Sequence, residues 1–416
     1  MKYVKSNPCF HSLAQKFRTF VPIMKQTERL WNANYVKVWC ANFMIFFSFM
    51  VVTPLLPLYL SETYQADKDT IGFVLSGYTL TALLARPVAG YLVDSFSRKV
   101  VLLTCYFLFF ALFAGYLIAG TMTLFTIIRT AHGAPMGAVT VANSTSAIDV
   151  LPSSRRAEGI GYYGLSNNLA TSMAPTVGLM IYDSIGNYNI IFLIALCAAG
   201  IGLVINATVH FPTKDIVPNK DPLSFDRFFL VKGWSEGLVM VCIGLSYGVL
   251  ATYLAIYGKE ELGMTAGTGA WFAVLCAGLI MSRLIGARSL RKGKVVENVN
   301  HGILISVFGY LLFALLKNPI GYYGAALIIG LGNGHIWPGM QTMFINLAPN
   351  NKRGTANSSQ LTCWDIGMGL GVVFGGMAIH HTGYSAAFWF AFVVNLLGVL
   401  FYFSYVKNHF IKNRLR

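Results

Sequence analysis

An aspartate lies in the middle of a long apolar run near the end of the chain. The run at 361–376 reads LTCWDIGMGLGVVFGG, and Asp365 is its only charged residue. A carboxylate at the centre of a membrane span costs roughly 2.5–3.5 kcal/mol, so it persists where it faces a polar cavity or a partner. We predict that Asp365 exchanges a proton or binds a cationic group. The equal alternative is a structural ion pair or a hydrogen bond between helices.

Two further titratable residues lie inside another apolar run. The segment RTAHG at 129–133 carries Arg129 and His132. An arginine inside a span is expensive and is normally functional or paired, although Arg129 could also reach toward the outer interface. His132 can titrate near neutral pH, and a hydrogen-bonded structural histidine is the alternative. We predict that both residues take part in proton movement.

The segment GYLVDSFSRK at 90–99 has the composition of a latch between helices. Gly90 allows two helices to approach closely. Asp94 can pair with Arg98 or with a helix end elsewhere, and Lys99 adds a second cation. We predict a latch at these four residues, the alternative being a basic loop that only sets topology.

Other polar and aromatic residues inside apolar runs are candidates for lining a substrate cavity, although aromatic residues more often pack than bind. The candidates are Asn42, Tyr78, Asn143, Asn167, Asn168, Tyr247, Tyr253, Asn333, His335, Trp337 and Gln341. Small residues with a proline predict a kinked, closely packed helix between two halves of the molecule. These are Ala174, Pro175 and Gly178. No phosphate-binding loop, nucleophile–base motif or metal-ligand cluster is present, so we expect no cofactor, no metal and no enzymatic activity.

The elements that position these residues are membrane-spanning helices. Only 11% of the 416 residues are charged, against roughly 25% in soluble proteins. Apolar runs of about 20 residues must close their own hydrogen bonds as helices within lipid. The fold class is therefore all-α and polytopic, with twelve spans. They are expected near 36–60, 70–93, 99–120, 121–148, 156–183, 187–210, 237–257, 266–287, 298–316, 320–346, 354–380 and 385–406.

The net charge of +15 is a topology signal rather than a nucleic-acid patch. Most basic residues fall in alternate loops and at both ends of the chain, and the positive-inside rule puts these in the cytoplasm. We expect a cytoplasmic segment at 1–34, bundles at 35–210 and 233–406, a cytoplasmic linker at 211–232 and a basic tail at 407–416. The first 23 residues are read as a peripheral tail or as a misassigned start before Met24.

A shift of 197 residues superimposes the two halves. It matches Arg86 with Arg283, Gly137 with Gly334, Pro152 with Pro349, Arg156 with Arg353 and Gly178 with Gly375. Six spans per half predict two bundles related by a pseudo-twofold axis along the membrane normal. The aligned residues differ at three positions of interest: Asp94 aligns with Arg291, Arg129 with Ala326 and Asn168 with Asp365. A latch based on paired charges is therefore expected only in the first half.

Three motifs resemble those of the major facilitator superfamily, over residues 34–406. The segment 90–99 matches the loop signature Gly-x-Leu-x-Asp-Arg-x-Gly-Arg-Arg/Lys, except at Ser95 and Ser97. The segment RTAHG is similar to Arg-x-x-Gln-Gly, whose arginine is linked to proton movement in proton-coupled members. The triad at 174–178 resembles Gly-Pro-x-x-Gly of antiporters, with alanine for the first glycine.

The resemblance implies alternating access around a central site lined by the first, fourth, seventh and tenth helices. It is nearest to twelve-helix drug and metabolite exporters driven by proton antiport. We therefore expect a small-molecule substrate, protons and a lipid bilayer as partners, no nucleic acid, a monomer, and the inner (plasma) membrane with both termini cytoplasmic. A proton-coupled importer of a sugar or organic acid, and a membrane-embedded enzyme, are the rival interpretations.

Overall fold

The computed structural model describes residues 29–66, 68–211, 225–264 and 268–415, and every regular element within these ranges is a helix. Twelve long helical segments follow one another, one for each predicted span. In chain order they are α2 Ala33–Val52 continued by η1 Thr53–Leu55 and α3 Leu56–Tyr64; α4 Lys68–Ser95; α5 Arg98–Ile118; α6 Met122–Val150; α7 Arg156–Ile185; α8 Tyr188–Ala207; α9 Trp234–Glu260; α10 Thr268–Arg291; α11 Val295–Leu315; α12 Pro319–Leu347; α13 Arg353–Thr382; and α14 Tyr384–Phe401 continued by η6 Tyr402–Val406 and α15 Lys407–Asn413. Single-turn helices join some of them: η2 Ser153–Arg155, η3 Phe225–Arg227, η4 Val231–Gly233 and η5 Asn350–Lys352.

Local sequence explains where these helices begin and break. The side chain of Asn32 accepts a hydrogen bond from the backbone N–H of Tyr35 at 2.9 Å and so caps α2, and Asn318 caps α12 in the same way. Such caps satisfy backbone donors that have no partner inside the helix. Pro54 and Pro57 interrupt the first segment at η1, because proline removes a backbone donor and clashes with the preceding turn.

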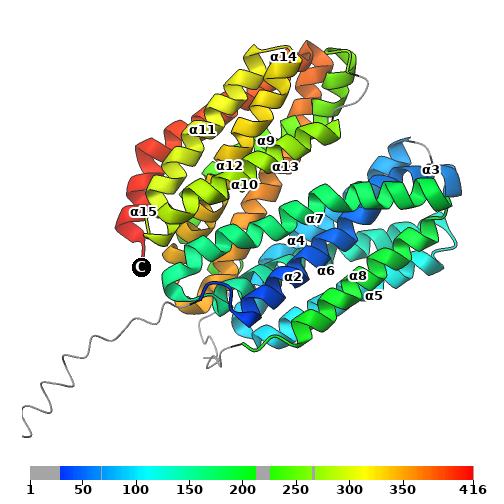
Figure 1. Ribbon diagram of the computed structural model, residues 1–416, viewed down its shortest axis with the longest axis horizontal. Coiled ribbons are helices and arrows are strands. Elements are labelled where there is room, and N and C mark those ends of the chain that lie inside the picture. The colour runs from blue at the N-terminus through cyan, green and yellow to red at the C-terminus, as the bar shows by residue number, and fades with distance from the viewer. Residues whose placement is uncertain (1–28, 67, 212–224, 265–267, 416) are drawn as a thin grey trace, which may run out of the picture.

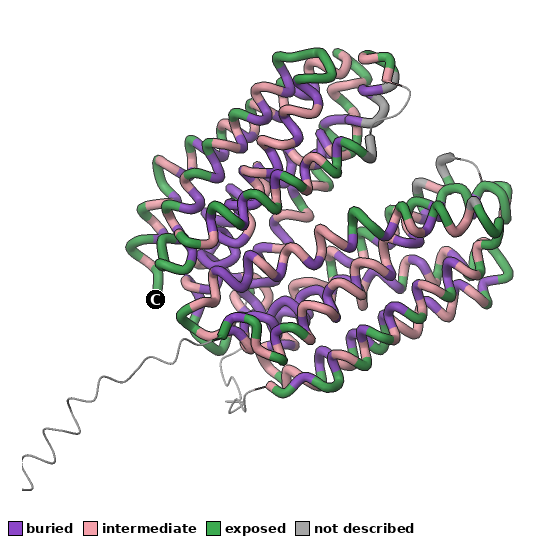
Figure 2. Tube along the Cα trace, in the orientation of Figure 1, coloured by how far each residue is buried: buried purple, intermediate pink, exposed green. Residues whose placement is uncertain are grey.

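The twelve segments form two bundles, α2–α8 and α9–α15 (Figure 1). The bundles meet at the end of the molecule that carries the C-terminus and diverge toward the end that carries α3 and the start of α14 (Figure 1). We call these the closed end and the open end. Figure 2 shows buried residues along the interior of each bundle and at the closed end. The predicted fold class of two six-helix bundles is confirmed.

The bundles touch along two seams at the closed end. In the first seam α4 packs against α13, and in the second α7 packs against α10 and α12. Glycine permits the approach in the first seam: a Cβ atom built on Gly90 would lie 2.1 Å from Oγ of Ser358, and one built on Gly354 would lie 2.7 Å from the carbonyl oxygen of Gly90. The two seams therefore bring together residues more than a hundred positions apart in the sequence.

Eight helical segments in the described part of the chain are long and apolar enough to cross a membrane by composition. The other four long segments are α4, α6, α7 and α12. Of these, α6 and α12 are buried along most of their length, while α4 and α7 form the seams. The buried polar side chains of α6 and α12 therefore face other helices, and these together with the seams are where a functional site is sought.

The predicted domain boundaries remain a prediction. Most of the expected N-terminal segment (1–28) and most of the expected linker (212–224) lie outside the described residues.

Candidate functional site

An ion pair joins the two bundles within the first seam. Asp365 stands twelve residues after the start of α13, about 18 Å along the helix axis. Its Oδ2 atom lies 2.9 Å from Nε of Arg86 on α4, although the Nε–H is not aligned for a hydrogen bond. The two side chains keep 23% and 16% of their surface exposed. The mid-span carboxylate therefore has an arginine partner and remains within reach of water.

The second seam holds an arginine at the position equivalent to Arg86, but this arginine has no carboxylate partner among the described residues. Arg283 of α10 is 5% exposed, donates from Nη1 to the carbonyl oxygen of Gly334, and lies beside Gly161 and Gly164 of α7. No carboxylate forms an ion pair with it in the described part of the chain. Asn168, the counterpart of Asp365, is half-buried on α7. Of these two equivalent positions, only that in the first seam carries a titratable acid.

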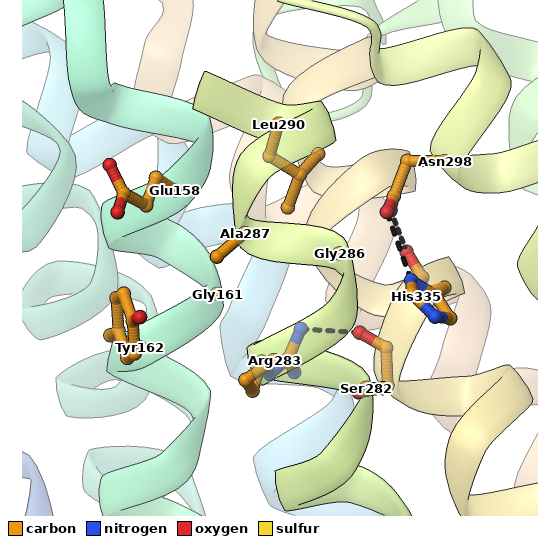
Figure 3. Close-up of a pocket in the computed structure, with 11 residues that line it drawn as sticks. Glu158, Gly161, Tyr162, Ser282, Arg283, Gly286, Ala287, Leu290, Asn298 and His335 are labelled. Carbon is orange, nitrogen blue, oxygen red and sulfur yellow. Dashed lines mark hydrogen bonds between the residues drawn. The ribbon is translucent and has the colours of Figure 1, made fainter. Parts of the chain in front are cut away.

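A small cavity lies beside Arg283 and is lined also by Glu158, Tyr162 and His335 (Figure 3). Its volume of about 10 Å³ suits about one water molecule and no substrate. His335 is buried, with Nδ1 2.9 Å from Oδ1 of Asn298, while Nδ2 of Asn298 donates to its carbonyl oxygen. His335 was expected to line the substrate cavity, but the structure gives it the environment of a helix-packing residue.

The predicted latch residue Asp94 contacts the second bundle at the closed end. Its carboxylate accepts hydrogen bonds from the backbone N–H groups of Gly354 and Thr355 at 2.8 and 2.7 Å. These groups begin α13, and a helix N-terminus attracts negative charge. Arg98 also lies 3.2 Å from Asp94. Both contacts that the sequence suggested for Asp94, to Arg98 and to a helix end of the other half, are present.

A second carboxylate, which sequence reasoning missed, completes this contact. Asp149 at the end of α6 lies 2.7 Å from Arg98 and 3.0 Å from Arg353 of the second bundle. Lys99, in contrast, makes no hydrogen bond or ion pair with the described residues and stays partly exposed. The structure thus draws Gly90, Asp94 and Arg98 into the first seam and leaves Lys99 outside it.

The second seam also carries paired charges, which corrects the expectation of a charge-paired latch in the first half alone. Arg291 stands where Asp94 would map and lies 2.9 Å from Glu158 near the start of α7. Glu158 is also paired with Arg155. The charges have exchanged helices between the repeats: the acid lies on α4 in the first seam and on α7 in the second. Because position 291 is an arginine, the alignment of the two halves does not indicate the acid at Glu158.

Arg129 and His132 lie within the first bundle, apart from Asp365. Arg129 donates to the hydroxyl of Tyr116 at 3.2 Å and stacks over the ring of Tyr78 at 4.0 Å, a cation–π contact. The same hydroxyl lies 2.8 Å from Nδ1 of His132. Tyr78 and Arg86 are eight residues, or about 12 Å, apart along α4. The predicted proton-coupling residues therefore lie in two separate places: Asp365 at the first seam, and Arg129 and His132 among aromatic rings inside the first bundle.

Asn42 and Asn143 were expected in the substrate cavity, but the structure buries both inside the first bundle. Nδ2 of Asn143 donates to the hydroxyl of Tyr163 at 2.8 Å, and that hydroxyl donates to Oδ1 of Asn42 at 2.6 Å. Asn42 also donates to Ser166, and Asn206 donates to Asn143. Polar groups inside spans are satisfied by one another when helices pack, and these connect α2, α6, α7 and α8.

We predict that Asn143→Leu lowers stability rather than substrate affinity. The substitution leaves the side-chain amide of Asn206 without its acceptor, while the Tyr163 hydroxyl loses one donor and keeps its bond to Asn42. An unpaired buried polar group costs about 1–3 kcal/mol. The unfolding temperature in detergent should fall by several degrees while the apparent KM for substrate stays constant. Asn167→Leu is the control, because Asn167 is half-buried and its side chain bonds, among the described residues, only Thr171 on its own helix. Equal unfolding temperatures for the two variants would contradict the assignment.

Two more cavity candidates take other places in the structure. Tyr78 is 5% exposed beneath Arg129. Gln341 of α12 donates to Oδ1 of Asn357 at 2.6 Å, and Asn357 donates to Ser144 of α6 at 2.6 Å. Gln341 therefore belongs to a polar layer that joins the bundles, close to the closed end.

The remaining candidates keep the partial exposure that a cavity lining requires. Asn167, Asn168, Tyr247, Tyr253, Asn333 and Trp337 are of intermediate exposure. The ring of Trp364, which sequence reasoning missed, lies 5.5 Å from that of Tyr247 and 5.0 Å from that of Trp337. Trp364 directly precedes Asp365 on α13, while Tyr247 lies on α9 and Trp337 on α12. These residues remain the predicted lining.

The packing triad lies elsewhere than predicted. Ala174 is buried and Pro175 half-buried on α7. A Cβ atom on Gly178 would lie 2.4 Å from the carbonyl oxygen of Val51 on α2. The close approach is thus within the first bundle and not between the halves, because α7 meets the second bundle only nearer the closed end.

Comparison with known proteins assigns the chain to a class. A sequence model described as Major Facilitator Superfamily matches residues 38–372 and 301–414. The staphylopine export protein of Staphylococcus aureus is 22% identical over 354 residues, covering 81% of this chain and 87% of the relative. The multidrug resistance protein MdtG of Erwinia billingiae is 24% identical over 389 residues, covering 89% and 92%.

Solved structures share the fold at low sequence identity. The human organic anion transporter MFSD10 (TETRAN) superimposes with a TM-score of 0.76 at 16% identity, covering 89% of this chain and 98% of that one. The transporter FucP, crystallised in the outward conformation, superimposes with a TM-score of 0.74 at 16% identity and the same coverage.

Proposed function

The chain belongs to the major facilitator superfamily, so it is a multi-pass membrane transporter rather than an enzyme, and we propose that it exports a small amphipathic drug or metabolite in exchange for protons. Transport would proceed by alternating access, with the two bundles rocking around a site between them. The transporter would reside in the inner (plasma) membrane and act as a monomer.

The ion pair between Asp365 and Arg86 is the observation that carries proton coupling. The pair spans the two bundles and remains partly exposed. Protonation of Asp365 would remove its charge, leave Arg86 without a partner and weaken the tie between α4 and α13. Loss of the proton would restore that tie. A single carboxylate would thus link its protonation state to the relative position of the bundles.

The arrangement of the bundles supports a direction for each step. Basic residues cluster at the junctions of α4 with α5, α6 with α7, α10 with α11 and α12 with α13, and in α15. The positive-inside rule would put this closed end and both termini in the cytoplasm. The conformation would then be outward-facing: substrate leaves and a proton reaches Asp365 from the open end. After the bundles rock, the proton would leave to the cytoplasm and substrate would bind.

The names of relatives favour export. One is an export protein and several are multidrug resistance proteins, although identities of 22–24% do not transfer a substrate. The importer alternative finds less support, because the fucose:proton symporter FucP resembles this chain in fold alone, at 17% identity.

The sign of proton movement tests the proposal in proteoliposomes that contain a pH-sensitive dye. Candidate substrates would be chosen from compounds to which a deletion strain becomes more susceptible. Substrate added outside should enter as protons leave, so we expect the lumen to become alkaline, and an acidic lumen should drive accumulation. Acidification of the lumen would indicate a symporter, and substrate movement without any pH change would remove proton coupling.

A further inference from the structure

A groove of about 710 Å³ lies at the closed end, apart from the seam contacts described above. Both bundles contribute to it: one wall comes from η2 and the start of α7, and the others from the ends of α10, α11 and α12 and from α15. Its lining residues include Arg156, Ile160, Lys294, Lys407, Ile411 and Arg414.

The groove is strongly basic. Four of its lining residues are basic, Arg156, Lys294, Lys407 and Arg414, and one is acidic, Glu297. Oε2 of Glu297 forms an ion pair with Nζ of Lys294 at 2.9 Å. The side chains of Lys407 and Arg414 form no ion pair with a carboxylate in the described part of the chain. The groove therefore has a formal excess of three positive charges and favours an anionic ligand.

The groove also lies at the level expected for lipid headgroups. The segment from α14 to α15 covers 30 residues, or about 45 Å, whereas the hydrocarbon core of a bilayer is about 30 Å thick. Its last turns in α15 must extend into the headgroup layer. There the backbone N–H of Leu415 donates to the carbonyl oxygen of Asn346 on α12, which holds the end of the chain beside the groove.

Apolar side chains accompany the basic ones. Ile411 of α15 is 45% exposed, and Leu415, two residues beyond the end of α15, is 56% exposed. Ile160, Leu290 and Val295 line the groove itself. A free phosphate would use the cations and leave these surfaces in water. A lipid would contact both, since its phosphate and its acyl chains are covalently joined.

We propose that this groove binds the headgroup of an anionic phospholipid. The phosphate lies among the basic side chains, and the acyl chains run along the apolar surface of α15 toward the bilayer. Because the groove has walls from both bundles, a bound headgroup bridges them and stabilises the closed end. Residues 1–28 of the chain carry five basic residues and one acidic residue, so their charge does not favour them as the ligand of a basic groove.

Binding of defined lipids to the purified full-length protein tests this site. Native mass spectrometry would follow titrations with dioleoyl phosphatidylglycerol, dioleoyl phosphatidylcholine and inorganic phosphate. The wild type should bind phosphatidylglycerol at least tenfold more tightly than phosphatidylcholine. The double variant Lys407→Gln/Arg414→Gln should weaken phosphatidylglycerol binding roughly thirtyfold. Each cation contributes about 1 kcal/mol, and a loss of about 1.4 kcal/mol lowers the affinity tenfold.

A matched variant removes the same charge outside the groove. Lys292 and Lys412 are exposed at the closed end and do not line the groove, so Lys292→Gln/Lys412→Gln should change binding less than threefold. Unfolding temperatures without lipid establish that both variants are folded. Equal binding of the two lipids by the wild type, equal loss in both double variants, or displacement of phosphatidylglycerol by inorganic phosphate at equal concentration would each overturn the proposal.

Discussion

Replacing Asp365 by asparagine should lower the initial rate of substrate accumulation driven by a pH gradient roughly a hundredfold, because an amide cannot exchange the proton. Removing one partner of a buried ion pair costs about 3–5 kcal/mol when the other charge is fully buried. Here the side chains of Arg86 and Asp365 are 16% and 23% exposed, so the pair is not fully buried and we expect a smaller cost. We therefore expect Asp365→Asn to fold and to reach the membrane.

Substrate exchange without a gradient separates coupling from structure. A transporter that cannot exchange the proton can still exchange labelled for unlabelled substrate, so Asp365→Asn should retain exchange while losing accumulation. The conservative variant Asp365→Glu keeps a titratable group and should retain accumulation in part. Asn168→Leu changes a residue of the predicted cavity lining at the equivalent depth of the other half without removing an acid. It should alter the apparent KM for substrate, while accumulation keeps its dependence on the pH gradient.

A purely structural ion pair predicts a different pattern. In that case Asp365→Asn loses both accumulation and exchange, and the charge-swapped pair Arg86→Asp/Asp365→Arg restores both. Accumulation by Asp365→Asn at neutral and acidic pH would remove the coupling role altogether.

The fold was predictable because lipid leaves a spanning segment few choices. Apolar runs gave all twelve segments, and the shift of 197 residues gave the two bundles. The shift also identified Arg86, but as shared scaffold, since Arg283 matches it. The shift does not predict that Arg86 faces Asp365, 279 positions away, across the first seam. Nor does it predict that Arg283 faces glycines in the second.

The candidate site was harder to predict, because residue type within a span does not reveal which way a side chain points. Asn143 and Asn167 are both asparagines inside apolar runs. Packing joins the first to Asn42 and Tyr163 inside a bundle and leaves the second half-buried. The exchange of charges between the seams could not be predicted either. The repeat places the counterpart of Asp94 on α10, whereas the acid of the second seam, Glu158, lies on α7.

The close approach of α4 and α13 makes Gly90→Ala the most disruptive small change at the closed end. The added Cβ would lie 2.1 Å from Oγ and 2.8 Å from Cβ of Ser358, and 3.0 Å from the carbonyl oxygen of Gly354. No single rotation of Ser358 relieves all three contacts. The two helices must therefore separate, which also lengthens the hydrogen bonds from Gly354 and Thr355 to Asp94.

Separation at the closed end should shift the population toward the opposite conformation by at least about tenfold, since charge-assisted hydrogen bonds contribute about 1.5–3 kcal/mol each. Spin labels on a cysteine-free background would report it. Labels at Ser153 and Lys292, exposed in different bundles at the closed end, should move apart. Labels at Thr63 and Thr382, exposed at the open end, should approach one another.

Two variants distinguish this steric effect from a general effect of alanine in a helix. Gly369→Ala, on α13, adds a Cβ that meets nothing within 4 Å and should leave both distance distributions unchanged. Gly90→Ala/Ser358→Gly removes two of the three close contacts and should recover most of the wild-type distribution. If Gly90→Ala keeps the closed end intact, or if the second substitution fails to restore it, the contact between Gly90 and Ser358 does not control closure. The latch would then rest on the charges of Asp94, Arg98, Asp149 and Arg353 alone.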